Sequence, residues 1–327
     1  MVEYILCTSY EGEESLYMSL QKINTVLKKA KETDVWTAFL IKVKNSTRVG
    51  TTYAARDINL KPTGATVGLV HRIIDRYINE DNSWISKKLL TVVEYDGTAE
   101  ETNIYRLNGN NQLIKDEFNA LKEALSNPER DGNPFEFKAT AYGLKSSIDI
   151  DGEPVPITML SMQNPVGILK NRFYYEEDTF QEMRDKVLNL RPVIDVLIIG
   201  NEVYMFTMQG ENLFNMERSY KAVCKATVID ICQTGIINND DLFSGVAQSG
   251  RNPRRFVSFQ PKRLEQMKDT NFRVAISKKF EMDLTDDNLI DTTAEGVAEK
   301  LVKLLCKKGM IDPFEDAPVE VPSVSKW

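Results

Sequence analysis

One stretch of this 327-residue chain decides how its middle folds: Val193-Ile194-Asp195-Val196-Leu197-Ile198-Ile199-Gly200-Asn201-Glu202-Val203-Tyr204-Met205-Phe206. Apolar and β-branched residues fill both halves of the stretch, which is typical of strands buried on both faces. Gly200-Asn201 lies between the halves and suits a two-residue turn. The stretch therefore predicts a strand over 193–199, a tight turn, and a second strand over 202–208.

Helical and strand patterns alternate on the amino-terminal side of this stretch. Apolar residues recur at helical spacing from Leu16 to Ala30, whereas β-formers are concentrated from Trp36 to Val43. The expected elements are a helix around 16–30, strands over 36–43 and 48–55, a helix over 66–78, strands over 89–95 and 102–107 around Asp96-Gly97, and a helix over 114–125.

A run of turn-forming residues follows the last of these helices. Asn127-Pro128-Glu129-Arg130-Asp131-Gly132-Asn133-Pro134 combines two prolines with a glycine, which no regular element tolerates. We expect the domain boundary there. The predicted parts are an N-terminal α/β domain over 1–126, a linker over 127–134, a C-terminal domain over 135–315 and an extended tail over 316–327. The expected fold class is α/β, or α+β: a two-part chain with mixed sheets flanked by helices.

The second half of the chain contains further elements with local signals. Prolines 154 and 156 suggest that the strand after the Asp151-Gly152 turn lies at an edge. Thr292-Thr293-Ala294-Glu295 has the pattern of a capping box. The expected elements are a strand over 135–142, a hairpin around Asp151-Gly152, a helix over 179–190, one or two helices over 213–231, and a terminal helix that closes at Gly309.

Composition limits the classes of function. The apolar runs are too short to cross a bilayer, and the first residues lack the pattern of a signal peptide. The single His71 argues against histidine-dependent catalysis, and the scattered cysteines lack zinc-site spacing. We therefore expect a cytoplasmic protein with reduced thiols, no metal and no cofactor. The cysteines are Cys7, Cys224, Cys232 and Cys306.

A cationic window interrupts the acidic background of the chain, whose formal net charge is -7. No acidic residue occurs from Leu242 to Leu264. Asn252-Pro253 and Gln260-Pro261 resemble helix starts, where backbone N–H groups and the helix dipole favour a bound anion. The cations of the window are Arg251, Arg254, Arg255, Lys262 and Arg263.

Other interpretations of the basic residues remain open at this stage. Cations on a helix face are commonly solvated, and the window could equally meet an acidic protein or lipid headgroups. Phe256 and Phe259 suit an inward helix face better than stacking on bases. A secondary basic surface is also predicted, and its cations are Lys42, Lys44, Arg48 and Arg56.

An enzymatic reading requires a metal site or a nucleophile. Asp195 and Glu202, on either side of the predicted turn, have the character of a nuclease carboxylate pair, although no lysine follows Glu202 at the usual position. A structural role for Asp195 at the end of its apolar run is the simpler interpretation. The chain has no phosphate-binding Gly-x-x-x-x-Gly-Lys loop. We expect a protein that is not an enzyme, with a metal-dependent nuclease using Asp195 and Glu202 as the alternative.

Four segments taken in order resemble a bacterial family. They are the run over 190–206, Glu211-Asn212-Leu213-Phe214, the segment over 249–255 and the terminal helix that ends in Gly309. Their combined order is similar to the family of the anti-phage Kiwa subunit KwaB, over about residues 135–315.

This resemblance implies a cytoplasmic subunit that an integral membrane partner, KwaA, recruits to the inner face of the membrane. It also implies binding of double-stranded phage DNA, which would stall replication and transcription without catalysis. A homodimer is the expected assembly. The resemblance favours phosphate contact as the role of the cationic window.

Overall fold

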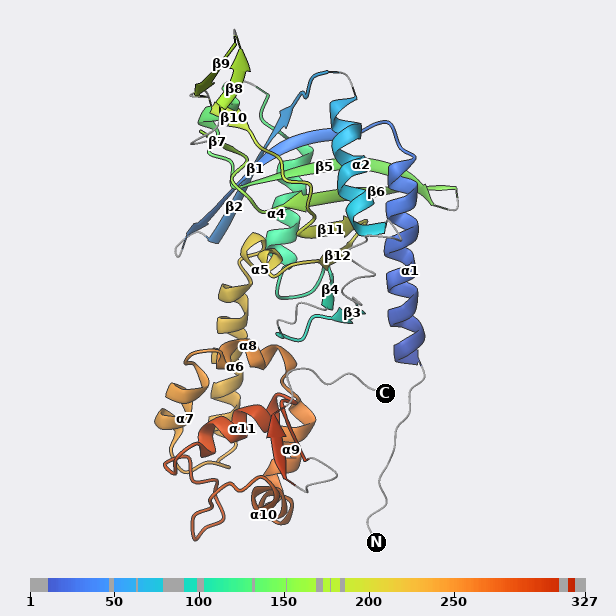
Figure 1. Ribbon diagram of the computed structural model, residues 1–327. Coiled ribbons are helices and arrows are strands. Elements are labelled where there is room, and N and C mark those ends of the chain that lie inside the picture. The colour runs from blue at the N-terminus through green and yellow to red at the C-terminus, as the bar shows by residue number, and fades with distance from the viewer. Residues whose placement is uncertain are drawn as a thin grey trace. The chain divides into compact units, whose positions relative to one another are not determined.

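The computed structural model describes residues 11–46, 50–62, 64–78, 91–98, 103–130, 133–150, 152–168, 173–176, 178–182, 186–311 and 317–320. Two compact units divide the chain (Figure 1). The first comprises Met1–Glu94 and Glu100–Asn215, and the second comprises Tyr95–Ala99 and Met216–Trp327.

An eight-stranded sheet forms the centre of the first unit, in the order β2-β1-β5-β6-β11-β12-β4-β3. Neighbouring strands are antiparallel except β3 and β4, which are parallel. The strands are β1 (Thr37–Ser46), β2 (Gly50–Ile58), β3 (Thr91–Glu94), β4 (Asn103–Asn108), β5 (Ala141–Ile150), β6 (Glu153–Ser161), β11 (Val196–Ile199) and β12 (Glu202–Met205).

Helices cover this sheet on both faces. Helices α1 (Glu11–Lys31) and α2 (Ala65–Ile78) lie over one face, and α4 (Lys115–Ser126) lies over the other (Figure 1). The remaining elements of the unit are a 3-10 turn η1 (Pro134–Glu136), short strands β7 (Val166–Ile168), β8 (Phe173–Glu176), β9 (Thr179–Glu182) and β10 (Lys186–Leu188), and helix α5 (Gln209–Leu213).

The β11–β12 hairpin lies in the interior of the sheet, between β6 and β4. Ile199 pairs with Glu202 across a turn in which Gly200 adopts φ +60°, a conformation that glycine reaches without strain. All four residues of β11 are buried. The predicted strand–turn–strand is therefore confirmed, with both strands shorter than expected.

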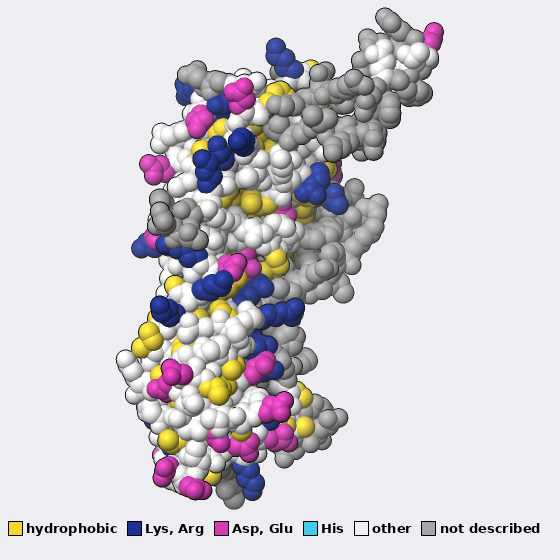
Figure 2. Space-filling model, turned by 90° about the vertical axis from the view of Figure 1, so that its left-hand side faces the viewer, with side chains coloured by type: hydrophobic (Ala, Val, Ile, Leu, Met, Phe, Trp, Pro, Cys, Tyr) yellow, Lys and Arg dark blue, Asp and Glu magenta, His cyan; other side chains and the backbone are white. Residues whose placement is uncertain are grey.

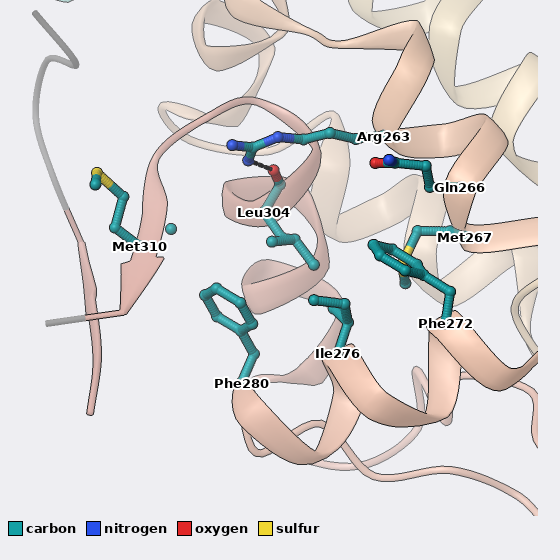
Figure 3. Close-up of a pocket in the computed structure, with 9 residues that line it drawn as sticks. Arg263, Gln266, Met267, Phe272, Ile276, Phe280, Leu304 and Met310 are labelled. Atoms are coloured by element: carbon teal, nitrogen blue, oxygen red, sulfur yellow. Dashed lines mark hydrogen bonds between the residues drawn. The ribbon is translucent and has the colours of Figure 1, made fainter. Parts of the chain in front are cut away.

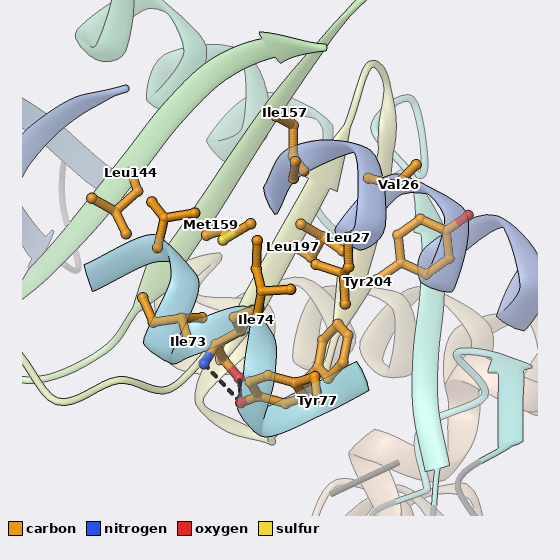
Figure 4. Close-up of a cluster of buried hydrophobic side chains, with 14 of the residues drawn as sticks. Val26, Leu27, Ile73, Ile74, Tyr77, Leu144, Ile157, Met159, Leu197 and Tyr204 are labelled. Carbon is orange, nitrogen blue, oxygen red and sulfur yellow. Dashed lines mark hydrogen bonds between the residues drawn. The ribbon is translucent and has the colours of Figure 1, made fainter. Parts of the chain in front are cut away.

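Tyr77 on α2 ties the chain entering β11 to the helical layer. Its hydroxyl donates to the carbonyl oxygen of Ile194 at 3.1 Å and accepts from the Ile194 N–H at 2.8 Å (Figure 4). The ring packs edge-on against Phe206 at 5.2 Å. Burial is the main cause that raises the pKa of Tyr77 to about 12. One side chain thus satisfies both backbone groups of a buried residue that lies outside the ladder.

A helical assembly around one apolar core forms the second unit. Cys224 and Cys306 are free thiols within that core, where burial raises their pKa to about 11 and about 12. The elements are α6 (Met216–Gln233), α7 (Asp240–Ala247), α8 (Asn252–Arg255), the 3-10 turn η2 (Phe256–Ser258), α9 (Pro261–Lys268), α10 (Thr270–Lys279), α11 (Val297–Leu305), β13 (Gly309–Ile311) and β14 (Pro318–Glu320).

A short segment from the first third of the sequence belongs to this second unit. Asp96 accepts from the ammonium group of Lys308 at 3.0 Å, and its backbone carbonyl accepts from the hydroxyl of Ser258. Lys308 is only 4% exposed, so this ion pair supplies the counter-charge that a buried ammonium group needs.

The expected fold class, mixed sheet flanked by helices in a two-part chain, is confirmed. The parts divide differently from the expected 1–126 and 135–315. Residues 127–134 lie inside the first unit, because strands on either side of them, β1 and β5, pair with each other. The structure places the main division between Asn215 and Met216. Of the expected tail over 316–327, residues 318–320 form β14, and 316 and 321–327 lie outside the described residues.

Several local predictions need correction. The predicted helix over 179–190 is wrong, since this stretch contributes β9 and β10, which pair with β8 and β7. Strand pairing there overrides the apolar spacing that suggested a helix. The segment over 135–142 becomes extended only at Ala141, after η1. The terminal helix begins at Val297 behind Gly296, at φ +75°, rather than at the predicted capping box.

The predicted edge position of the strand with Pro154 and Pro156 is wrong, because β6 pairs with β5 on one side and with β11 on the other. Strand β11 pairs with Ile157 to Leu160 of β6, whereas Pro154 and Pro156 pair only with β5. At Pro154 and Pro156, β6 has a neighbouring strand on one side only. No N–H donor is needed on the other side, so the prolines are tolerated there.

Replacing Tyr77 by Phe should destabilise the first unit by about 1–3 kcal/mol, because the buried N–H and C=O of Ile194 would both lose their partner. Urea denaturation followed by tryptophan fluorescence would measure the change. Tyr53→Phe is the control, since the hydroxyl of Tyr53 makes a single hydrogen bond within the described ranges, to the Leu213 carbonyl, and its loss should cost about 1 kcal/mol or less. An equal loss in both variants would contradict the anchoring role of Tyr77.

Candidate nucleic-acid interface

The cationic window runs from α7 through α8 and η2 into α9. Helix α9 begins at Pro261 behind Gln260, as predicted. Helix α8 begins one residue earlier than expected: Arg251 is its N-cap, and Asn252 is buried with its side-chain amide donating to the Val246 carbonyl at 2.9 Å. Asn252 therefore helps to fix the loop and does not cap the helix.

Arg254 connects α8 to the segment over 95–99. Its guanidinium donates to the Thr98 carbonyl at 3.1 Å and to the Tyr95 hydroxyl at 3.4 Å. A Cβ at Gly97 would collide with the Arg254 carbonyl oxygen, so the two backbones are in close contact. The charge of Arg254 is thus used within the fold of the second unit.

Arg255 and Arg263 are also engaged inside the second unit. Arg255 forms an ion pair with Glu299 at 3.4 Å and donates to Asn252, and its side chain is 19% exposed. Arg263 donates to the Leu304 carbonyl at the end of α11, and burial lowers its pKa. Three of the five residues predicted to contact phosphate are therefore bound to other groups of the second unit.

Arg251 and Lys262 differ from these three. Both side chains are exposed, and neither has a hydrogen-bond or ion-pair partner among the described residues. The aromatic residues between them face inward: Phe256 is 1% exposed and stacks on Phe259 at 6.3 Å. This confirms the core interpretation of Phe256 and Phe259.

Helix α6 carries a basic stripe that the sequence reading missed. Arg218, Lys221 and Lys225 recur at i, i+3 and i+7, so they project from one face, and all three are exposed. Lys221 forms an ion pair with Glu217, whereas Arg218 and Lys225 have no partner within the described part of the chain. The helical spacing was visible in the sequence, but Glu217 and Asp230 on the same helix obscured it.

Charges on one face of the molecule are mixed. On the face drawn in Figure 2, Lys and Arg side chains are interspersed with Asp and Glu rather than forming one positive field. Such a surface favours a few defined phosphate contacts over indiscriminate attraction of polyanions.

The predicted secondary basic surface does not form as expected. Arg56 is 8% exposed, pairs with Glu129 at 3.1 Å and lies over the ring of Phe137 at 5.2 Å. Lys42 approaches the same ring, at 5.9 Å from the centroid, while Lys44 is exposed. Arg48 lies outside the described residues. Arg56 stabilises the β2 edge and is not available to line a groove.

The carboxylates of the nuclease alternative are separated. Asp195 directly precedes β11, whereas Glu202 pairs with Ile199 at the far end of that strand, about 13 Å away along the backbone. Asp195 is buried and accepts from the Thr207 hydroxyl at 2.6 Å and the Met162 N–H at 2.7 Å. Hydrogen bonding thus confirms the structural interpretation of Asp195.

Glu202 belongs to a separate charged cluster on the first unit. Its carboxylate accepts from Lys22 and from the Tyr204 hydroxyl at 3.0 Å. Desolvation alone would raise the pKa of Glu202, but the hydrogen bonds from Lys22 and Tyr204 and the charges of Lys22 and Arg106 outweigh it and lower this pKa. A carboxylate with these partners is an ion-pair member. It does not form a metal site with Asp195.

Metal sites and membrane-spanning helices are both absent from the described residues. In the described ranges, no three His, Cys, Asp or Glu side chains gather as a metal site. His71 is engaged through its Nε2, 2.9 Å from the Lys31 carbonyl. No helix in the part of the chain that the structure describes has the length and apolarity needed to cross a bilayer.

Comparison with known proteins gives one match. Residues 163–309 match the family model described as Kiwa protein KwaB-like, which confirms the resemblance read from the sequence over a shorter range than 135–315. No curated protein and no solved structure matches the chain. The matched residues contain the β11–β12 hairpin, α6 and the whole cationic window.

Arg254→Ala should destabilise the second unit by about 1.5–3 kcal/mol, because it removes charged hydrogen bonds to the segment over 95–99. Arg251→Ala, three residues away and exposed, should change stability by less than about 0.5 kcal/mol. Thermal unfolding of the two variants would measure the difference. Equal melting temperatures would show that Arg254 is not structural.

Proposed function

We propose, from the KwaB-like region over residues 163–309, that this chain acts in Kiwa anti-phage defence by binding phage DNA. The family match supports the defence role. The surface of the second unit supports the binding mode, because it presents cations that the described residues leave unpaired. The four such cations that lie on α6 and in the cationic window are Arg218, Lys225, Arg251 and Lys262.

The observation that carries the proposal is the division of the basic residues into two groups. Arg254, Arg255 and Arg263 bind carbonyl, amide or carboxylate groups of the protein, whereas Arg251 and Lys262 point to solvent without such acceptors among the described residues. An exposed, unpaired cation contributes nothing to folding that a neutral residue would not, but it can neutralise a phosphate and release a counterion.

Phosphate contacts carry no sequence information, so the proposed binding is non-specific. The chain as a whole has a formal net charge of -7, and its acidic surface opposes contact elsewhere and confines DNA to the cationic surface. A bound protein then obstructs polymerases on the occupied duplex. This action requires no catalytic group, and we propose that the chain acts without cleaving DNA.

The proposed assembly has two further components. A membrane-embedded partner, KwaA, would hold the chain at the inner face of the membrane, where injected DNA first appears. A homodimer would place two cationic surfaces on one duplex, which raises the effective affinity without any new contact.

A salt titration tests the binding mode. Four phosphate contacts should give a slope of log affinity against log salt of about -3.6, so that affinity falls by about two orders of magnitude between roughly 50 and 200 mM salt. Removing two of the four cations should halve the slope. Fluorescence anisotropy of a labelled duplex with Arg218→Ala/Lys225→Ala and Arg251→Ala/Lys262→Ala measures both quantities.

The matched control is Lys278→Ala/Lys279→Ala, which removes the same charge from exposed positions on α10. This control should retain the slope of the unmodified protein. Unchanged binding in both double variants, or an equal loss in the control, would reject the proposed surface. Arg254 and Arg255 are left intact, because their loss would disturb folding.

Duplex DNA incubated with the protein and magnesium or manganese should remain uncut, because Asp195 and Glu202 are too far apart to share an ion. Gel electrophoresis of supercoiled and linear DNA would detect nicks and breaks. Cleavage that disappears in Asp195→Asn would restore the nuclease alternative, provided that the variant keeps the melting temperature of the unmodified protein.

A further inference from the structure

A pocket of about 270 Å³ opens on the second unit. Its lining is mostly apolar, unlike the exposed cations proposed to contact DNA. Helices α9, α10 and α11 and strand β13 contribute its walls (Figure 3). Most of the lining is apolar, and it comprises Met267, Phe272, Ile276, Phe280, Leu304 and Met310.

Two of the lining side chains are exposed although they are large and apolar. Phe272 is 36% exposed and Met310 is 42% exposed, whereas Met267 beside them is 1% exposed. The pocket therefore has a buried floor and an apolar rim that water covers. A ligand with an apolar body would remove both rim side chains from water.

The polar groups of the pocket are concentrated on one side. Arg263 spans the top of the pocket in Figure 3, and Gln266 lies one helical turn further along the same helix. The Arg263 guanidinium donates through Nη1 to the Leu304 carbonyl, and no carboxylate among the described residues pairs with it. Its remaining N–H groups can therefore bind an anion bidentately.

The environment of Arg263 strengthens this interpretation. Burial lowers its pKa, so the charged guanidinium is poorly hydrated where it lies. Such a charge gains more from an anionic partner than one in open solvent does. The contact to Leu304 also holds the guanidinium in place, which reduces the entropy that binding would cost.

We propose that this pocket binds a small amphipathic monoanion: a medium-length acyl chain or single aromatic ring that carries one carboxylate. The apolar body lies against Phe280, Ile276 and Leu304, and the carboxylate lies on Arg263. Pockets for drug-sized ligands span roughly 300–1,000 Å³. This pocket is slightly smaller, which selects a short chain or one ring over a larger lipid.

Gly309 contributes to the shape of the pocket. A Cβ at this position would lie 3.3 Å from the Phe280 ring, tighter than ordinary contact. The glycine thus allows β13 to lie close to Phe280, and no side chain at this position fills the pocket that Phe280 and Met310 line.

The proposal does not depend on DNA binding. It assigns Arg263 to a ligand site, whereas the proposed DNA contacts use Arg251 and Lys262 and not Arg263. Lys262 is adjacent to Arg263 in sequence and exposed, with no partner in the described ranges, so it provides a matched control of equal charge.

Calorimetric titration of the full chain with octanoate and with octanol tests the site. Octanoate should bind, and octanol should bind about tenfold more weakly, because it lacks the charge-assisted hydrogen bonds. Arg263→Gln should reduce octanoate affinity about tenfold and leave octanol unchanged. Lys262→Gln should change neither.

A second variant fills the pocket without touching the charge. Ile276→Trp should abolish binding of both probes, and its melting temperature shows whether it folds. The proposal is overturned if octanoate fails to bind at millimolar concentration, if Arg263→Gln binds it as well as the unmodified chain does, or if a folded Ile276→Trp still binds it. Duplex binding by Arg263→Gln should be unchanged, which separates this site from the proposed DNA surface.

Discussion

The insertion of the β11–β12 hairpin between β6 and β4 is the constraint on which the first unit depends. Both outer neighbours come from earlier parts of the chain, so the hairpin completes a sheet that would otherwise consist of two separate halves. The KwaB-like region over 163–309 contains the hairpin but neither β4 nor β6. That region alone would expose two strand edges, and it therefore requires the rest of the chain to fold.

Local signals predicted the parts of this fold that depend on neighbouring residues. The Gly200-Asn201 turn and the apolar run before it identify β11 and β12 because the turn chemistry and the burial are both local properties. The pairing of that hairpin with β4 joins residues far apart in the sequence. Nothing in residues 103–108 indicates which strand pairs with them. The helix predicted over 179–190 was wrong for the same reason, since pairing with β7 and β8 determines the conformation of these residues.

The cationic window shows a similar limit. The sequence identified an acid-free run and the start of α9, but it could not distinguish charges that are available from charges that are used. The acceptor of Arg254 is a carbonyl at Thr98, far away in the sequence, and that of Arg263 is a carbonyl at Leu304. Backbone acceptors carry no sequence signature, so only the structure separates Arg251 and Lys262 from their neighbours.

The placement of residues 95–99 in the second unit has a consequence for biosynthesis. Asp96 leaves the ribosome long before Lys308, its ion-pair partner 212 residues later, which at cellular rates is a delay of roughly 10 to 40 s. The nascent chain carries an unfinished second unit throughout that interval. A polypeptide released or cut before Lys308 keeps Asp96 without its cation, so intact length is a condition for completing this unit.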